Sequence, residues 1–448
     1  MLEDTSTPVV VLVCHHHVGV GIMRSLGRLG VSVYGIDADR FSPAFFSRYC
    51  RGKFIWDLHK ITAAEALKRL DEVNRSIGRR ALLIPTSDIG TMLVAEHASE
   101  LADKFIFREL DADTVRSLCS KKEMYYLARK CDVPVPETAF PESRADVLRY
   151  LETARFPILL KPIYPQVPGN KTKKWRMEIV TGRAHLLERY DAVEDHDTPN
   201  VMLQEYVAGG DEMTWTFNGY FDRDGECRVA FTGRKLRNFP AYFGQASLAV
   251  CQRNDYVQDT TIRFMKEIGY RGPLDLGYRY DARDGRYKVN DINPRIGAMF
   301  RLFVDPNGVD VARAFYEDMT GQPVTPAAPA PEGRKWIVED VDLFSSIRYW
   351  RDGKLTLRDW RRSRRGIQER AFLARDDPFP LAGAYLMDVK RSLSNRFGKE
   401  QENARGETSA AQAPVIAQVN SNSHQSVTEG HEHARNGRAA DHTAERIA

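Results

Sequence analysis

The chain has 448 residues, of which 42% are hydrophobic, 10% aromatic and 28% charged. This is the composition of a globular protein, and it excludes a chain that is mainly disordered, collagenous or coiled coil. Lysine and arginine number 65 against 61 acidic residues, and a formal charge of +4 predicts no extended nucleic-acid surface. The apolar run at residues 8–14 is far shorter than the roughly 20 residues of a membrane helix, so we expect no transmembrane segment.

The amino terminus lacks the basic region and the small-residue cleavage site of a secretory signal, so we expect a cytoplasmic protein. Six cysteines are scattered along the chain without a C-x-x-C pair. This spacing argues against a zinc ribbon or a disulfide framework and favours reduced thiols.

Strand and helix patterns alternate over residues 1–117, which predicts a Rossmann-like α/β domain with a parallel sheet. The apolar runs 9–14, 31–36 and 81–85 are expected strands, and helical periodicity runs from the glycines at 19 and 21 to Leu29 and again over 63–77. The glycine pattern is an incomplete dinucleotide fingerprint, because Arg24 stands where a small residue is needed, so NAD is not expected.

Two polar clusters in this region have open interpretations. His15, His16 and His17 lack a nearby carboxylate or cysteine partner, which favours a polar or substrate-facing loop over a zinc site. Thr86 and Asp88 follow the strand at 81–85, at the edge where open α/β sheets bind ligands. Thr86 is favoured as the N-cap of the next helix, and Asp88 fits either a cap or a ligand contact.

Residues 118–321 have the pattern of an α+β domain. We expect a helix over 121–130, strands at 156–162 and 201–207, and mainly strands over 214–250. A hairpin should join 274–280 to 287–292 through the turn at 281–285.

The rest of the chain has three expected parts. Residues 322–334 are rich in proline and alanine and predict a linker. Residues 335–397 are aromatic and basic, with four arginines within 361–365, and predict a small folded appendage. Residues 398–448 contain no aromatic residue and are expected to be a disordered tail.

The lysines and carboxylates dispersed over residues 118–303 resemble those of the ATP-grasp superfamily. Three short motifs point to one group within it: Ser47-Arg48-Tyr49, Ile84 to Asp88 and Gln204 to Val207. The texture is similar to carboxylate-amine ligases of the D-aspartate ligase type. The resemblance implies a pre-ATP-grasp domain before a two-lobe ATP-grasp domain. It also implies an ADP-forming ligase, in which Mg-ATP phosphorylates a carboxylate and an amine displaces the phosphate. The resemblance implies that the substrates are a small-molecule acid and a small-molecule amine. It also implies that two copies of the chain form a homodimer.

The resemblance assigns Lys121 and Lys161 to the phosphates of ATP, with Lys122 as the alternative to Lys121. A solvated lysine is the ordinary interpretation of either, but the apolar strand before Lys161 argues for a buried ammonium that needs a partner. Adenine would pair with the segment that contains Gln204, Glu205 and Val207. The ribose would pair with Asp211 or Glu212, unless these acids belong to a solvated turn.

Asp291 and Asn293 alternate onto one face of an expected strand, as hard oxygen donors for Mg²⁺ or Mn²⁺ would. Asp275, across the hairpin, is the third expected ligand. The resemblance puts the glutamate of the family at Gly277, so Asp275 would replace it or Mg²⁺ would be held more weakly. Arg295 resembles the arginine that stabilises the transferred phosphoryl group, with a structural salt bridge as its alternative.

Lys235 and Arg237 should lie on one side of a strand and cover the triphosphate, unless they form a solvated basic loop. The segment 164–174 has only Gly169 where relatives carry a phosphate flap rich in glycine and serine. Three further functions remain open: an ATP-grasp kinase or carboxylase, a non-catalytic nucleotide-binding protein, and peripheral membrane contact through 361–365 and 381–387. A basic helix face is the alternative to that membrane contact.

Overall fold

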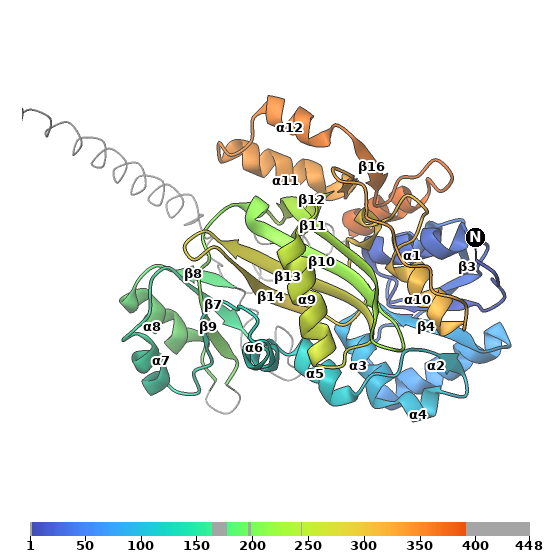
Figure 1. Ribbon diagram of the computed structural model, residues 1–448, viewed down its shortest axis with the longest axis horizontal. Coiled ribbons are helices and arrows are strands. Elements are labelled where there is room, and N and C mark those ends of the chain that lie inside the picture. The colour runs from blue at the N-terminus through green and yellow to red at the C-terminus, as the bar shows by residue number, and fades with distance from the viewer. Residues whose placement is uncertain (1, 164–176, 196–198, 243, 391–448) are drawn as a thin grey trace, which may run out of the picture.

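The computed structural model describes residues 2–163, 177–195, 199–242 and 244–390, which form three β-sheets with helices packed on them (Figure 1). The predicted phosphate flap at 164–174 and the predicted tail at 398–448 lie outside these residues. None of the described helices is both long and apolar enough to cross a membrane.

The first sheet has five parallel strands in the order β3-β2-β1-β4-β5, which confirms the predicted Rossmann-like α/β fold. Its strands are β1 (Val9–Leu12), β2 (Val33–Asp37), β3 (Cys50–Ile55), β4 (Ala81–Pro85) and β5 (Phe105–Ile106). Every residue of β1 is buried, because helices cover both faces of a parallel sheet. These helices are α1 (His16–Gly27), α2 (Ala63–Ile77), α3 (Asp88–Glu96) and α4 (Ala98–Leu101).

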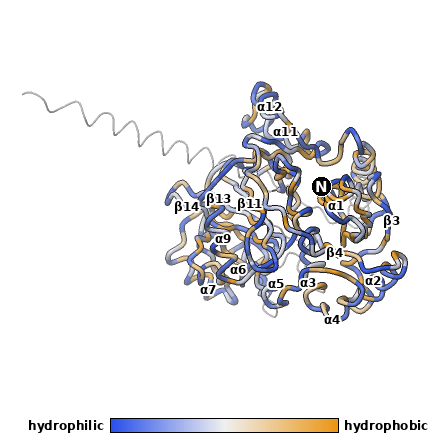
Figure 2. Tube along the Cα trace, turned by 45° about the vertical axis from the view of Figure 1, so that its right-hand side comes forward, coloured by the Kyte–Doolittle hydropathy of each residue, from blue (hydrophilic) through white to orange (hydrophobic). Residues whose placement is uncertain are grey.

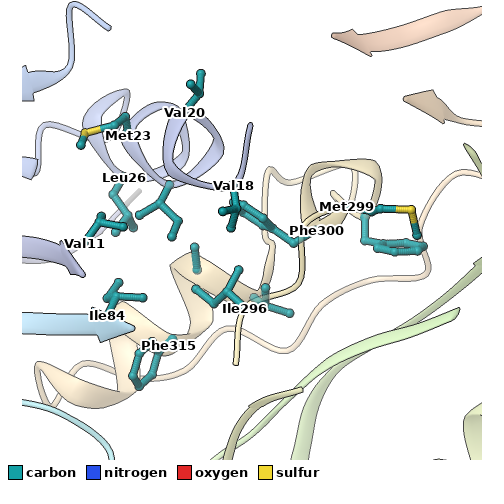
Figure 3. Close-up of a cluster of buried hydrophobic side chains, with 14 of the residues drawn as sticks. Val11, Val18, Val20, Met23, Leu26, Ile84, Ile296, Met299, Phe300 and Phe315 are labelled. Atoms are coloured by element: carbon teal, nitrogen blue, oxygen red, sulfur yellow. The ribbon is translucent and has the colours of Figure 1, made fainter. Parts of the chain in front are cut away.

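One face of this sheet joins the rest of the molecule through α1. Figure 3 shows Val18 of α1 beside Phe300, and Leu26 of α1 belongs to the same buried cluster as Ile296 and Phe315. Ile296, Phe300 and Phe315 come from the chain around the short helix η3 (Phe300–Leu302) and from α10 (Val311–Met319). A Cβ atom at Gly21 would lie 2.6 Å from the Phe300 ring. Gly21 therefore permits close helix packing, and its spacing from Gly19 does not indicate a dinucleotide site.

The prediction of a polar loop at the three histidines is wrong. His16 and His17 form the first turn of α1, and His15 is the residue just before the helix, so this segment is helical and not a loop. The His17 ring lies 5.1 Å from the ring of Trp336 and 6.2 Å from that of Phe372. Desolvation lowers the pKa of His17 to about 4, so this partly exposed imidazole is neutral near pH 7.

The second sheet has four antiparallel strands in the order β6-β9-β7-β8. They are β6 (Thr138–Ala139), β7 (Ile158–Pro162), β8 (Glu178–Val180) and β9 (Val201–Glu205). Apolar side chains of α7 (Arg144–Tyr150) and α8 (Arg183–Val193) pack on Ile158, Leu160 and Leu203. Two helices, α5 (Ala112–Cys119) and α6 (Lys121–Lys130), precede this sheet, and α6 has the bounds that the sequence predicted.

The third sheet has seven strands in the order β14-β13-β10-β11-β12-β15-β16. They are β10 (Thr214–Phe221), β11 (Cys227–Phe239), β12 (Gln245–Cys251), β13 (Gly272–Asp281), β14 (Arg286–Asn293), β15 (Lys335–Ile337) and β16 (Ile367–Arg370). The strands from β14 to β12 pair antiparallel, which confirms an α+β middle region with the expected hairpin. Helix α9 (Asp255–Glu267) covers one face, and the other face holds the polar side chains described below.

The region after residue 334 is continuous with this third sheet. Strand β15 pairs with β12, and Trp336 is 1% exposed in the same core as α1. Helices α11 (Glu339–Arg351) and α12 (Leu357–Arg364) follow, and they lie at the outer edge of the molecule in both views (Figures 1 and 2). The sequence predicted a small appendage here, and its first strand extends the main sheet.

Candidate active site

A cavity of about 210 Å³ lies between the second and third sheets. Strands β7 and β9 supply one wall, and β11, β13 and β14 supply the other. The lining includes the side chains of Lys161, Gln204, Asp211, Lys235, Asn238, Arg279 and Asn290. A cavity with three cations among its polar groups, held between two sheets, is suited to a polyanionic ligand.

Lys161 and Gln204 face each other across neighbouring strands of the second sheet. The Lys161 ammonium donates to Gln204 Oε1 at 2.7 Å, and the Gln204 amide donates to Thr138 Oγ1 at 3.1 Å. Lys121 lies at the first position of α6 and lines a small cavity together with Lys161 and Gln204. Burial, reinforced by the positive charge of Lys121, lowers the pKa of Lys161 to about 8. Two cations are thus held near each other at a helix N-terminus, an arrangement that favours an anion.

Lys122, the alternative to Lys121, has a different environment. Its ammonium lies 3.2 Å from Glu142 Oε1 and 6.0 Å from the centre of the Phe140 ring. It is absent from the lining of both cavities. The structure therefore favours Lys121 as the partner of Lys161.

The segment after β9 lies along the cavity. Glu205 forms ion pairs with Arg283 at 2.6 Å and Lys288 at 3.1 Å, so its carboxylate is already engaged. The Val207 carbonyl accepts a hydrogen bond from Arg279 at 2.7 Å, and the Gly209 carbonyl accepts another at 2.5 Å. Arg279 was not among the predicted site residues. Its signal in the sequence was its position two residues after Gly277, on the same strand face.

The structure distinguishes between the two candidate acids at 211 and 212. Asp211 is buried, lines the cavity, and accepts hydrogen bonds from Asn238 at 2.8 Å and from the hydroxyl of Tyr349. Burial raises the pKa of Asp211. Glu212 is exposed and folds over Gly210, where its Oε2 lies 2.3 Å from the place of an added Cβ. Tyr349 lies 138 residues from Asp211 in the chain, so no local pattern could have indicated it.

The three expected metal ligands lie together on β13 and β14. Asp275 is paired with Asn293, and Gly277 is paired with Asp291, in the register of the two strands. The Asn293 amide donates to Asp291 Oδ2 at 3.0 Å. Burial, opposed by the charge of Arg295, raises the pKa of Asp275.

This cluster contains two carboxylates and one amide. Within the described part of the chain, no group of three or more His, Cys, Asp or Glu side chains is arranged to hold a metal ion. A Cβ atom at Gly277 would meet nothing closer than Asp291 at 3.9 Å. There is therefore room for a Cβ atom at position 277, next to Asp291.

Arg295 connects this cluster to the first sheet. Its guanidinium donates to Asp88 Oδ1 at 2.7 Å and to Asn293 Oδ1 at 2.9 Å.

The expectation that Thr86 caps α3 is wrong, because Ser87 Oγ accepts the Gly90 N–H at 3.2 Å and the Thr86 hydroxyl donates to the Val13 carbonyl. Asp88 is thus the partner of Arg295, and the salt bridge weighed for Arg295 is present in the structure.

Strand alternation predicted that Lys235 and Arg237 lie on the same side of the strand. This prediction is wrong, because the two side chains lie on different sides of β11. Lys235 lines the cavity, and burial lowers its pKa. Arg237 is 3% exposed and donates two hydrogen bonds of 2.9 Å to Asp342 of α11. The pairing with β12 shifts on both sides of Arg237, and this irregularity reverses the alternation. Arg237 therefore ties β11 to α11, away from the cavity.

The motif Ser47-Arg48-Tyr49 also has structural contacts. Ser47 Oγ and the Arg48 N–H donate to the Asp377 carboxylate at 2.9 and 2.8 Å. The Tyr49 hydroxyl donates to Asp376 at 2.6 Å. Buried Arg24 donates to the same Asp377 at 2.9 Å. These residues hold the C-terminal part of the described chain against the first sheet.

Comparisons with known proteins agree with this architecture. No family model matches the chain. The D-aspartate ligase of Enterococcus faecium is 26% identical over 299 residues, which are 63% of this chain and 69% of that protein. The C-terminal section of the carbamoyl phosphate synthase large chain of Methanopyrus kandleri is 20% identical over 253 residues, 54% of this chain. The chain spans less than half of that relative, 45% of its length.

Solved structures share the fold over most of the chain. The N5-carboxyaminoimidazole synthetase of Staphylococcus aureus complexed with ADP has a TM-score of 0.58 at 11% identity and covers 78% of this chain and 88% of its own. The L-amino acid ligase of Bacillus licheniformis has a TM-score of 0.54 at 14% identity, and the match covers 73% of this chain and 78% of the ligase. The fold consists of two sheets with a cavity between them, preceded by an α/β domain. The chain therefore shares its fold with these two enzymes and is similar in sequence to a D-aspartate ligase.

Proposed function

We propose that this protein is an ATP-dependent carboxylate-amine ligase. The observation that carries the proposal is that Lys121 and Lys161 lie together at a cavity that Asn290 of β14 also lines, where the charge of Asp291 acts on Lys161 and the charges of Asp275 and Asp291 act on Lys235. Cations for a triphosphate and hard oxygen donors for its metal are the two requirements of phosphoryl transfer from ATP. The similarity to D-aspartate ligase supports a ligase within the superfamily.

In this proposal the nucleotide lies in the cavity of about 210 Å³. Lys161 and Lys121 neutralise the phosphates as point charges. The backbone of the segment from Glu205 to Val207, with the Gln204 side chain, pairs with adenine. Asp211 accepts the ribose hydroxyls, because it lines the cavity and Glu212 does not.

Asp275, Asp291 and Asn293 would hold Mg²⁺ or Mn²⁺. Their donors are carboxylate and amide oxygens, which these hard cations prefer, and their register places them on adjacent strands. The cation, when bound, neutralises charge on the transferred phosphoryl group. Asn293 donates through its nitrogen to Asp291, so its oxygen is oriented toward Arg295 and the donor set is already ordered.

The chemistry takes two steps. An oxygen of the acid substrate attacks the γ-phosphorus of ATP, the bond to the β-phosphate oxygen breaks, and ADP leaves. The amine nitrogen then attacks the acyl carbon, phosphate leaves with the electron pair, and the ammonium product loses one proton. Arg295 and Lys235 stabilise the charge that develops on the phosphoryl and acyl oxygens. No covalent bond to the protein is required.

We would test the proposal by measuring ADP release with Mg-ATP and pooled acids and amines, with Asp291→Ala and Lys161→Ala beside the unaltered protein. A ligase releases ADP only with particular pools, requires an amine for free phosphate, and loses activity in both variants. A stable phosphorylated product without an amine would indicate a kinase, and a requirement for bicarbonate would indicate a carboxylase. ATP binding without ADP release from any pool would contradict the proposal and favour a non-catalytic nucleotide-binding protein.

A further inference from the structure

Helix α11 exposes apolar side chains and buries polar ones. Its outward positions are Leu343, Phe344, Ile347 and Trp350, and Phe344 and Trp350 are 61% and 65% exposed. Its buried positions include Asp342, Ser345 and Tyr349, which contact β11 and the loop after it. A helix that covers a soluble protein has the opposite distribution, so the outward face of α11 is built for a second, apolar environment.

An apolar groove separates α11 from α12. It encloses about 310 Å³ and is lined by Leu343, Ile347, Trp350, Leu355, Leu357 and Trp360, with only two hydroxyl side chains besides. Two tryptophans in one exposed groove are unusual on a water-facing surface, since each combines a large apolar ring with a polar N–H group. Side chains of this kind favour the boundary between an apolar phase and water.

Helix α12 places a row of arginines beside this groove. Arg358, Arg361 and Arg362 recur at intervals of three and four residues and share one helix face, and Arg365, the residue after the helix, lines the same hollow with them and Leu357. All four are exposed. Arg364 points elsewhere, stacks on Trp360 at 4.9 Å and pairs with Asp342 at 3.3 Å. The segment 357–365 thus carries five arginines against one acid, Asp359.

We propose that the α11–α12 surface, formed by the apolar groove and the row of four arginines, binds an anionic membrane surface. Guanidinium groups attract anionic lipid headgroups, and adjacent aromatic and aliphatic side chains enter the boundary between headgroups and acyl chains. Both helices lie at the outer edge of the molecule, where a flat surface can reach them (Figures 1 and 2). Charge complementarity and apolar exposure point to the same occupant.

Other occupants fit less well. Pairing with a second copy through this face would bring two arginine rows together, and like charges oppose such an interface. A nucleic-acid backbone would match the arginines but would leave the groove in water. The sequence suggested 381–387 as the apolar partner of the arginines. This is wrong for part of the stretch, because Ala384 and Met387 are buried in the protein.

The test is co-sedimentation of the full chain with phosphatidylcholine vesicles that contain 0% or about 30% phosphatidylglycerol. We expect binding only to the anionic vesicles, with affinity that falls as salt rises. Replacement of two arginines, Arg361→Gln with Arg362→Gln, should lower the partition coefficient about 30-fold, at about fivefold for each basic group. Trp350→Ser should lower it about tenfold without changing the salt dependence.

The matched control removes two exposed charges from the first domain, Lys68→Gln with Arg75→Gln, and should bind vesicles as the unaltered protein does. All variants carry exposed substitutions, and equal melting temperatures would verify their folding. Equal binding to both vesicle types, or full binding by the arginine variant, would overturn the proposal. So would a dimer that Trp350→Ser dissociates, or duplex-DNA binding that replaces vesicle binding. The surface shares no residue with the nucleotide cavity, so the outcome is independent of the proposed ligase activity.

Discussion

Replacing Lys161 with methionine should make the ligand-free protein more stable while it abolishes ATP binding. The Lys161 ammonium is buried beside Lys121, and these two causes lower its pKa from 10.5 to about 8. Between these values the unfolded chain binds the proton more strongly than the folded one. The protonated Lys161 therefore lowers the free energy of unfolding, by its full amount at every pH below about 8. The penalty is relieved as pH rises from 8 to 10.5.

The size of this penalty follows from the pKa difference. A shift from 10.5 to about 8 corresponds to about 3 kcal/mol at most. The ammonium keeps a 2.7 Å hydrogen bond to Gln204 and remains partly accessible, so about 1 to 3 kcal/mol is the expected gain for methionine. Methionine is unbranched and fills nearly the same volume, which avoids a cavity. For a chain of this length the gain corresponds to a rise of about 1 to 3 °C in melting temperature.

The assay is thermal unfolding of the ligand-free protein from pH 7 to 10, followed by titration with ATP. Loss of a charge-assisted contact should weaken ATP binding at least about 30-fold. In the unaltered protein, the Kd for ATP should rise above pH 8 as Lys161 loses its proton, and the methionine variant should lack this rise. Lys122→Met is the matched control and should bind ATP normally, because Lys122 lies outside both cavities. A methionine variant that is less stable than the unaltered protein, or that binds ATP normally, would refute the reasoning.

Three further changes test other parts of the structure. Gly277→Glu should supply a third carboxylate beside Asp291 and lower the Mg²⁺ concentration for half-maximal ADP release about tenfold, measured by metal titration. Tyr349→Phe removes the hydroxyl that orients Asp211 and should raise the half-saturating ATP concentration about fivefold with kcat unchanged, measured by steady-state kinetics. Asp377→Ala leaves Arg24 buried without its carboxylate and should lower the free energy of unfolding by about 3 to 5 kcal/mol, measured by urea denaturation.

Each of these changes has an outcome that would contradict it. If Gly277→Glu left the Mg²⁺ concentration for half-maximal ADP release unchanged, position 277 of β13 would not be part of the metal site. A fall in kcat at constant half-saturating ATP in Tyr349→Phe would place the tyrosine effect in the chemical step. A loss under about 1 kcal/mol in Asp377→Ala would show that Arg24 finds other acceptors.

The elements of this fold are largely determined by local patterns. Helices α2 and α6 have the bounds that periodicity predicted, and the hairpin of β13 and β14 turns where the Asp-Gly pair placed it. Apolar periodicity and turn residues act over a few positions, so they can be interpreted without knowledge of the tertiary structure. The alternation of Asp291 and Asn293 on one strand is of this kind, and so is Lys161 at the end of an apolar strand.

Contacts between distant segments were decided only by the tertiary structure. Tyr349 reaches Asp211, Arg237 turns to Asp342, and Arg295 pairs with Asp88 across separations of 138, 105 and 207 residues. No local pattern encodes such partners, because they follow from how whole sheets and helices pack. A single strand irregularity was enough to send Arg237 away from Lys235. The sequence by itself indicated the candidate residues for a nucleotide and a metal, and packing decided which of them lie together.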